Sequence, residues 1–285
     1  MKITLTSDQI NTYRQDGFLV IPDFLIQDEL AAWREAVDDA VARREDRKLA
    51  DGRWRSGDSY YDNVFIQRIN LWQDHEGMRR LMLDPRLGQV AAQLARVDGI
   101  RIWHDQALIK APWGNATAWH LDNPYWSFSS RDAITIWVAL DDATLENGCL
   151  YFIPGTHKLA TYDNSHIGEN MGDLFRVYPD WGKMKATAAP MKAGSCSFHN
   201  GLIAHGAGAN MTPGYRRAMT CAYMPDGSTF NGQKNVLSDA QIARLKVGDR
   251  LEDEDQNPLI YHKNKSHALP RSTSAEGGKQ HRKER

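Results

Sequence analysis

The spacing of apolar residues has a helical period in the first third of the chain. An amphipathic helix is predicted for residues 28–46, where apolar side chains recur every three or four positions, at Leu30, Trp33, Val37 and Val41. A first helix is predicted between the capping box of Thr6 with Gln9 and a stop at Gly17. A short buried strand is expected directly after it. We therefore expect a mainly helical N-terminal part over about residues 1–98.

After about residue 99 the pattern changes to the alternation of apolar and polar residues that is typical of strands. Strands are predicted at 100–110, 116–122, 133–140, 149–153, 195–199, 202–207 and 217–224. Turns rich in Gly, Pro and Asn separate them, which favours an antiparallel sandwich or barrel over βαβ units. The fold class predicted is α+β, mainly β, with a β core at about 99–226.

Three further segments complete the organisation. Residues 158–184 interrupt the strands with Gly, Asp and Asn among aromatic residues, and they predict either an active-site lid or a structured surface loop. A C-terminal helix is expected at about 238–248. Residues 263–285 are polar and basic, which is typical of a disordered tail. We expect a single domain over residues 1–262.

Composition narrows the classes of function. The chain has 285 residues, 41% of them hydrophobic and 25% charged, with a formal net charge of −1. This near-neutral balance gives no general argument for nucleic acid or an acidic membrane as partner, and no apolar run is long enough to span a bilayer. The three cysteines lack metal-ligand spacing, so we expect a reduced, cytoplasmic protein. The expected partner is a small-molecule substrate, and the expected state is a monomer or homodimer.

The chemistry is predicted to centre on His120 and Asp122. Residues two apart in an extended segment point the same way, so these side chains should project together. A histidine and a carboxylate are two of the three ligands of non-haem Fe(II) oxygenases, although such a triplet also occurs by chance on protein surfaces. The third candidate is His205, which precedes a glycine-rich turn. His199 is the competing candidate, and we expect His104 and His157 to be hydrogen-bonded core or rim residues.

Arg216 and Arg217 follow His205 by eleven and twelve residues. Adjacent strand residues face opposite ways, so only one of the two can point into a barrel. A guanidinium there needs a carboxylate partner, because an unpaired buried charge is very costly. A bound dicarboxylate would supply one. The alternative is that both arginines form surface salt bridges. A zinc hydrolase would account for the metal ligands but not for the arginine.

Several motifs together resemble the phytanoyl-CoA dioxygenase family of Fe(II)- and 2-oxoglutarate-dependent oxygenases. They are the segments 5–10, 16–22, 119–123, 136–142, 147–150, 153–158 and 205–210, with the arginine pair at 216–217. The resemblance covers most of the chain. It implies a double-stranded β-helix (jelly-roll) core with the N-terminal helices packed on one sheet.

The resemblance also implies roles for individual residues. The iron ligands would be His120, Asp122 and His205, and Arg216 would bind the far carboxylate of 2-oxoglutarate. Further cosubstrate contacts would come from neighbouring strands, at Gln106 or Lys110, and at Thr135 with Trp137 on the same face. Candidate substrate contacts are Trp119, Asn123, Tyr125, Trp126 and Trp181, and Trp113 belongs to the same aromatic set.

The implied activity is oxidation of a C–H bond in a small organic molecule by O2, with release of succinate and CO2. The carboxylate at Asp122 separates the chain from related halogenases, in which a small residue at that position makes room for chloride. One alternative is an acyl-CoA 2-hydroxylase, whose CoA phosphates could be bound by lysines at 183, 185 and 192. A second alternative is a non-catalytic jelly-roll binding protein.

Overall fold

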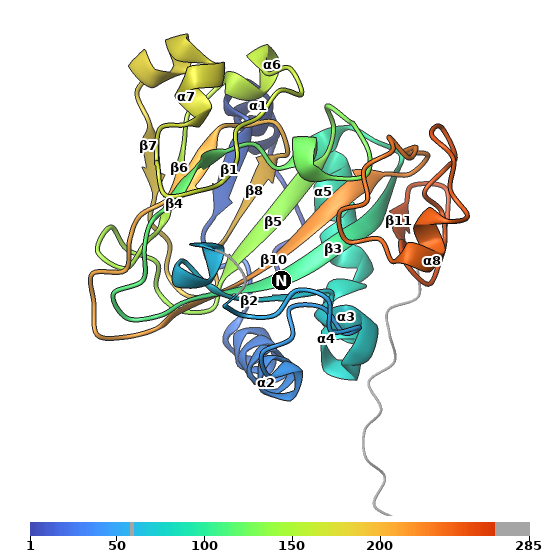
Figure 1. Ribbon diagram of the computed structural model, residues 1–285, viewed down its shortest axis with the longest axis horizontal. Helices are drawn as coiled ribbons and strands as arrows, with labels where there is room; N and C mark the ends of the chain where they lie inside the picture. Colours follow the sequence, from blue (N-terminus) through green and yellow to red (C-terminus); the bar gives the residue numbers. More distant parts are fainter. Residues whose placement is uncertain (58–59, 266–285) are drawn as a thin grey trace, which may run out of the picture.

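The architecture is two facing antiparallel sheets with helices on the outer side of the larger one (Figure 1). The computed structural model describes residues 1–57 and 60–265. The predicted mixture of helices with a mainly antiparallel β core is therefore confirmed. Most of the predicted tail, from residue 266 onward, lies outside the described residues.

The larger sheet has seven strands in the order β1-β8-β5-β10-β3-β11, with β2 paired to β3, and the smaller sheet has four in the order β4-β9-β6-β7. The strands are β1 Phe18–Ile21, β2 Ile66–Ile69, β3 Gly99–Lys110, β4 Thr117–His120, β5 Ile134–Ala139, β6 Leu150–Phe152, β7 Thr187–Ala189, β8 Cys196–Asn200, β9 His205–Ala207, β10 Arg216–Pro225 and β11 Leu259–His262.

The helices gather mainly in the N-terminal part and in the insertion after β6. The α-helices are α1 Ser7–Asp16, α2 Gln27–Arg44, α3 Leu71–Asp74, α4 Glu76–Met82, α5 Pro85–Ala95, α6 Thr156–Leu159, α7 Leu174–Val177 and α8 Asp239–Ile242. Single 3-10 turns occur at η1 Tyr60–Asn63, η2 Asn123–Tyr125 and η3 Pro179–Lys183.

Local sequence signals account for the helix ends. Thr6 and Gln9 form the expected capping box, and Gly17 ends α1 with φ 85°, a left-handed conformation that glycine adopts without steric cost. The break between α4 and α5 occurs at Asp84, whose side chain caps α5 ahead of Pro85. The predicted capping box and the stop at Gly17 are confirmed.

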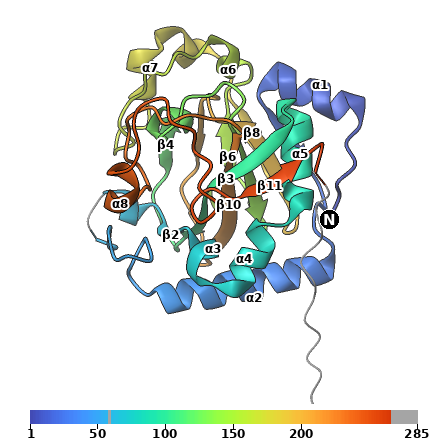
Figure 2. The ribbon, with the colours of Figure 1, turned by 90° about the vertical axis from the view of Figure 1, so that its right-hand side faces the viewer.

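The two faces of the larger sheet have different neighbours. Alternate residues of β5, such as Ile136 and Val138, join a core shared with the helices α1, α2, α4 and α5. Trp137 and Ala139 face the other way, into a core shared with the smaller sheet. In Figure 2, α1 and α5 lie on one side of β3, β8 and β10, and β4 lies on the other. The space between the sheets thus receives every second side chain of the long strands.

Some elements differ from the sequence prediction. Strands β2, β7 and β11 were not predicted, because each is only three or four residues long and is defined by its pairing with β3 or β6. The C-terminal helix is shorter than the expected 238–248 and covers only Asp239–Ile242. The chain turns after it, because the Asp249 carboxylate accepts a hydrogen bond from the Lys246 backbone N–H and Gly248 is left-handed.

None of the helices among the described residues combines the length and the apolar character needed to cross a bilayer.

The close approach of β4 to β9 generates a prediction about Gly206, which lies on β9 directly after His205. A methyl group at position 206 would lie 2.8 Å from the Thr117 carbonyl oxygen of β4. Because backbone must shift to relieve this contact, Gly206→Ala should lower the free energy of unfolding by about 1–3 kcal/mol. Chemical denaturation measures the change.

Gly208→Ala is the matched control. Its methyl group would lie 3.5 Å from the Gly148 Cα, an ordinary contact, so we expect little change in the free energy of unfolding. Equal stability of the two variants would contradict the tight packing inferred at Gly206.

Candidate active site

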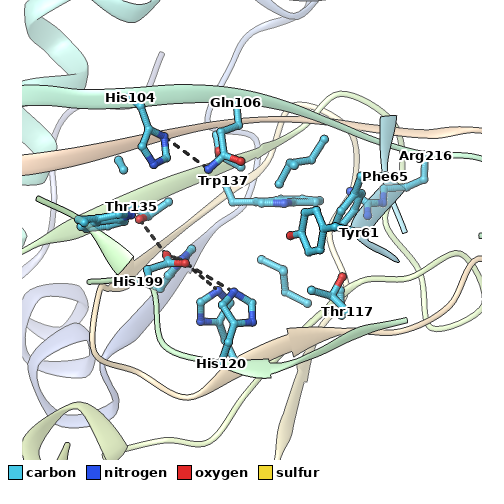
Figure 3. Close-up of a pocket in the computed structure, with 18 residues that line it drawn as sticks. Tyr61, Phe65, His104, Gln106, Thr117, His120, Thr135, Trp137, His199 and Arg216 are labelled. Carbon is cyan, nitrogen blue, oxygen red and sulfur yellow. Dashed lines mark hydrogen bonds and ion pairs between the residues drawn. The ribbon is translucent and has the colours of Figure 1, made fainter. Parts of the chain in front are cut away.

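Two adjoining cavities lie against the inner face of the larger sheet. The inner cavity, of about 70 Å³, is lined by residues of both sheets. The outer cavity, of about 440 Å³, opens beyond it. Residues that line both cavities are Tyr61, His104, Gln106, His120, Asp122 and Trp126. Figure 3 shows the inner cavity, with His120 and His199 at one end and Arg216 at the other.

His120 and His205 lie opposite each other in the pairing of β4 with β9. The Nδ1–H of His120 donates to the Ala118 carbonyl at 2.8 Å, and that of His205 donates to the Ile203 carbonyl at 3.1 Å. A proton on Nδ1 leaves the lone pair of each neutral ring on Nε2. Both Nε2 atoms face the Asp122 Oδ1, at 3.5 and 3.7 Å.

The ligand atoms of His120, Asp122 and His205 all lie within 4.8 Å of one another. Two imidazoles presented through Nε2 and one carboxylate are the donor set of a non-haem Fe(II) site that keeps other coordination positions open. Backbone carbonyls behind the two rings fix the ring orientation, as in established metal sites. The chemistry of this cluster therefore fits a divalent metal ion.

Asp122 reaches the cluster by a different route from the one the sequence predicts. β4 ends at His120, and Asp122 has helical backbone angles, φ −80° and ψ −53°. Its backbone N–H donates to the Gly201 carbonyl at 3.0 Å. The expectation that His120 and Asp122 converge is met, but strand alternation up to residue 122 is wrong. A turn held by Gly201 brings the carboxylate back toward the two histidines.

The second carboxylate oxygen of Asp122 has partners of its own. Oδ2 accepts hydrogen bonds from the Thr135 hydroxyl and from the His199 Nε2, each at 3.3 Å. Thr135 and His199 are neighbours across the pairing of β5 with β8. Burial opposes the charge on Asp122, but His205, His120 and His199 together hold the pKa of that carboxyl well below its usual range. His199 therefore lies behind the carboxylate, outside the three-residue cluster.

Arg216 and Arg217 point in opposite directions, as strand geometry predicts. Arg217 donates to Asp141 through Nε at 2.9 Å and Nη2 at 2.7 Å, and to Asp38 at 2.6 Å. Arg216 is 1% exposed and lines the inner cavity. Its Nε and Nη1 have no hydrogen-bond partner among the described residues. Burial lowers the pKa of Arg216 only to about 10, so the guanidinium stays charged at neutral pH.

Lys110 lies beside Arg216, although it is not among the residues that line the inner cavity. It lies opposite Arg216 in the pairing of β10 with β3, and its Nζ is 4.6 Å from the centroid of the Phe65 ring. The Arg216 guanidinium lies 5.5 Å from the same centroid. Nζ donates to the Asn115 carbonyl at 2.5 Å. Burial and the charge of Arg216 lower the pKa of Lys110 to about 7. This end of the cavity therefore suits an anion.

Polar and aromatic residues connect the two ends of the inner cavity. Thr135, Trp137 and Gln106 line it. Gln106 accepts a hydrogen bond from the Gln67 amide at 2.5 Å. The Arg216 guanidinium lies 5.2 Å from the Trp137 ring centroid. Thr135, Trp137 and Gln106, all singled out from the sequence, thus line the same cavity as the metal-ligand cluster and Arg216 (Figure 3).

The aromatic candidates divide into two groups. Tyr125 and Trp126 line the outer cavity. Trp119 and Trp181 do not, because both pack in an apolar cluster beneath the 158–184 insertion. The amide of Asn123 is used inside a turn, where it contacts the Phe128 carbonyl and the Ser130 N–H. None of these three residues lines the outer cavity, so the expectation that Trp119, Asn123 and Trp181 contact the substrate is wrong.

Trp113 is also outside the cavities and is 65% exposed. The 158–184 insertion contacts the segment 121–125 through one backbone carbonyl and one side-chain amide. The Tyr125 hydroxyl donates to the Ser165 carbonyl, and the Asn164 amide donates to the Leu121 carbonyl at 2.9 Å. His166 and Ile167 then line the outer cavity. Part of the insertion therefore forms one wall of the outer cavity.

Sequence reasoning missed the contribution of residues 60–69. Tyr61 and Phe65 line the inner cavity, and Gln67 holds Gln106. This stretch follows a polar segment and contains only a 3-10 turn and a four-residue strand. Phe65, Gln67 and Ile69 are two residues apart and would share one face of a strand, which was the available signal. Three positions are too few to distinguish a strand from a loop.

Comparison with known proteins links these features to a family. A family model described as phytanoyl-CoA dioxygenase (PhyH) matches residues 13–218. A methylphosphonate hydroxylase of Gimesia maris is 28% identical over 232 residues, which cover 78% of this chain and 82% of that protein.

Two similar solved structures belong to nogalamycin biosynthesis. The non-haem α-ketoglutarate-dependent carbocyclase SnoK is 29% identical, with a TM-score of 0.76 over 90% of this chain and 96% of that one. The epimerase SnoN, in complex with Fe3+, α-ketoglutarate and nogalamycin RO, is 27% identical, with a TM-score of 0.71 over 89% of this chain and 97% of that one.

The partners of Asp122 generate a prediction about His199. His199→Phe removes the donor to Oδ2 and should weaken binding of a divalent ion by about tenfold or more, because hydrogen bonds to a ligating carboxylate tune metal affinity. His199→Gln keeps an N–H donor and should retain most of the affinity. Titration with Co2+ measures both constants, and thermal melting checks folding. Wild-type affinity in the Phe variant would disprove the role given to His199.

Proposed function

The chain belongs to the phytanoyl-CoA dioxygenase (PhyH) family, and we propose that it oxidises a C–H bond of a small organic molecule, in the first instance by hydroxylation. It is a 2-oxoglutarate-dependent dioxygenase that uses Fe(II), 2-oxoglutarate and O2. Succinate and CO2 are the proposed coproducts.

In this proposal the metal is bound by the Nε2 atoms of His120 and His205 and by the Oδ1 of Asp122. Bound iron, with 2-oxoglutarate and O2, supplies the oxidising chemistry. The protein orients the ligands, with His199 and Thr135 fixing the carboxylate from behind. His166 and Ile167 of the insertion line the outer cavity and would help to exclude water from the reacting centre.

The observation that carries the proposal is the buried guanidinium of Arg216, whose Nε and Nη1 find no hydrogen-bond partner among the described residues, in the same cavity as the metal-ligand cluster. Such a group costs free energy unless a ligand carboxylate pairs with it. A dicarboxylate cosubstrate can bind the metal with one end and Arg216 with the other, in a bidentate hydrogen-bonded pair. A zinc hydrolase site would leave this charge without a purpose.

The remaining polar residues of the inner cavity have supporting roles in this proposal. Gln106 would hydrogen-bond the cosubstrate, Thr135 would line its site while its hydroxyl holds Asp122, and Trp137 would pack along it. Lys110 would add positive charge next to Arg216. We further propose that the two sheets form a double-stranded β-helix core and that residues 1–262 act as one catalytic domain.

An acyl-CoA 2-hydroxylase is less well supported. Of the lysines considered for CoA phosphates, Lys183 pairs with Asp180 and Lys192 with Asp142. Neither they nor Lys185 are among the residues that line the two cavities. The names of the similar proteins also differ in substrate, from methylphosphonate to nogalamycin, so they give no common substrate to transfer to this chain.

The proposed function predicts a visible charge-transfer band when Fe(II) and 2-oxoglutarate are added without oxygen. The band needs both groups on one metal, so His120→Ala should abolish it. In air, the wild-type protein should release succinate slowly even without substrate. If the protein binds Fe(II) but shows no band and releases no succinate, the oxygenase assignment is refuted.

A second prediction compares the two arginines. Arg216→Gln removes the charge-assisted pair with the far carboxylate of 2-oxoglutarate, worth about 1.5–3 kcal/mol, so affinity should fall by about tenfold to a hundredfold. Arg217→Gln breaks only ion pairs with Asp38 and Asp141 and should leave the affinity nearly unchanged. Calorimetric titration gives both values. Equal losses would show that the inner cavity is not the cosubstrate site.

A further inference from the structure

The outer cavity is large for a simple metabolite. Its volume is about 440 Å³, whereas a cavity of about 150 Å³ suffices to bind benzene. It adjoins the metal-ligand cluster through His120 and Asp122, so a molecule in it would present a C–H bond to the metal. This volume suits a ligand with about two or three rings.

The described residues that line the outer cavity include no lysine, arginine or acid that is free to pair with a charged ligand. Among its described lining residues, Lys48 is the only lysine or arginine, and Asp122 is the only acid. The Lys48 Nζ pairs with the Asp62 carboxylate at 2.7 Å, and the two side chains are only 6% and 12% exposed. Asp122 is committed to the metal-ligand cluster. Burial lowers the pKa of His104 to about 4, so this imidazole is neutral. A charged substrate group would therefore find no free lysine, arginine or carboxylate among the described lining residues, and its burial would be costly.

Aromatic side chains form much of the cavity wall. They are Trp54, Tyr60, Tyr61, Tyr125 and Trp126. Flat side chains favour flat ligands, because rings pack by stacking or edge-to-face contact. The apolar remainder comes from Ile69, Ile167 and Val236.

Trp54 and Asn235 form what we call the rim of the outer cavity. The rim combines backbone strain with an unused hydrogen-bond acceptor. Trp54 and Asn235 both have left-handed backbones, with φ 57° and 39°, and they also line a shallow depression next to the cavity. Arg53 fastens the two segments together, donating to the Val236 and Leu237 carbonyls at 3.1 and 2.9 Å. The buried Asn235 Oδ1 lacks a hydrogen-bond partner among the described residues. Strain and an unused acceptor at one place are typical of a ligand-binding position.

We propose, building on the proposed function, that the substrate is an uncharged molecule of two or three rings, whose outer ring packs on Trp54 and whose hydroxyl or N–H group donates to Asn235. The metal-facing end of the molecule then lies between Tyr125 and Gln106. Phosphonates, free acids and CoA thioesters whose charged part must enter the cavity are excluded from this class.

A binding experiment with matched probes tests the proposed class. The anaerobic protein with Fe(II) and 2-oxoglutarate is titrated with neutral, colourless two- and three-ring alcohols and ketones. Each is compared with its own sulfate ester and its own trimethylammonium derivative, and methylphosphonate and octanoyl-CoA complete the set. Perturbation of the charge-transfer band reports binding next to the metal. Absence of the band before any probe is added would refute the proposed function itself, not the substrate class.

We expect neutral members to perturb the band and their charged derivatives to bind at least about a hundredfold more weakly, because the added charge finds no partner. Charged derivatives that bind as well as their neutral parents would overturn the proposal. So would a set in which only methylphosphonate or octanoyl-CoA perturbs the band, or in which no neutral member does.

Variants of the rim test the residues named. Trp54→Ala should weaken the best neutral probe about tenfold, which corresponds to about 1.4 kcal/mol. Trp113→Ala is the matched control, because Trp113 is exposed and lines neither cavity, and it should have no effect. Asn235→Gly suits the left-handed backbone but loses the acceptor, so it should weaken binding without loss of thermal stability. Asn235→Asp keeps an acceptor and should bind the probe more tightly than Asn235→Gly. Equal affinities in all four variants would overturn the assignment of the rim.

Discussion

The carboxylate of Asp122 is the contact on which the site depends. One oxygen faces the Nε2 atoms of His120 and His205, and the other is held by Thr135 and His199. These partners come from both sheets, so the carboxylate ties the smaller sheet to the larger one at the metal end. Both histidines owe their orientation to backbone carbonyls of their own segments. The cluster is therefore preorganised by the pairing of β4 with β9 and by the turn at Gly201.

The inner cavity is polarised along its length. The Asp122 carboxylate and two imidazoles occupy one end, and the guanidinium of Arg216 occupies the other, with Lys110 beside it. The larger sheet makes this possible, because alternation sends apolar side chains toward the helices and leaves the opposite face for polar groups. Segments outside the two sheets then supply most of the outer cavity, together with residues of β2, β3 and β4. Conserving the inner chemistry while varying these segments is a physical route to different substrates on one fold.

Much of this arrangement could be predicted from the sequence because its signals are local. Capping residues, Gly17 and Pro85 define helix ends, and strand alternation separates Arg216 from Arg217. Contacts made only by tertiary pairing could not be predicted in the same way. His199 acts through β8 lying beside β5, and Gln67 acts through a strand of four residues. Trp181 shows the opposite error. It was expected to contact the substrate, but it packs in a small apolar core beneath the insertion.

The central claim is that one cavity binds iron through His120, Asp122 and His205 and binds 2-oxoglutarate against Arg216. The most direct test is an anaerobic crystal structure with Fe(II) and 2-oxoglutarate, with anomalous diffraction recorded at the iron edge. We predict an iron peak bonded to both Nε2 atoms and to the Asp122 Oδ1, with Oδ2 still held by His199, and the far carboxylate of 2-oxoglutarate on Arg216. Iron bound through His199, or 2-oxoglutarate bound away from Arg216, would contradict this account.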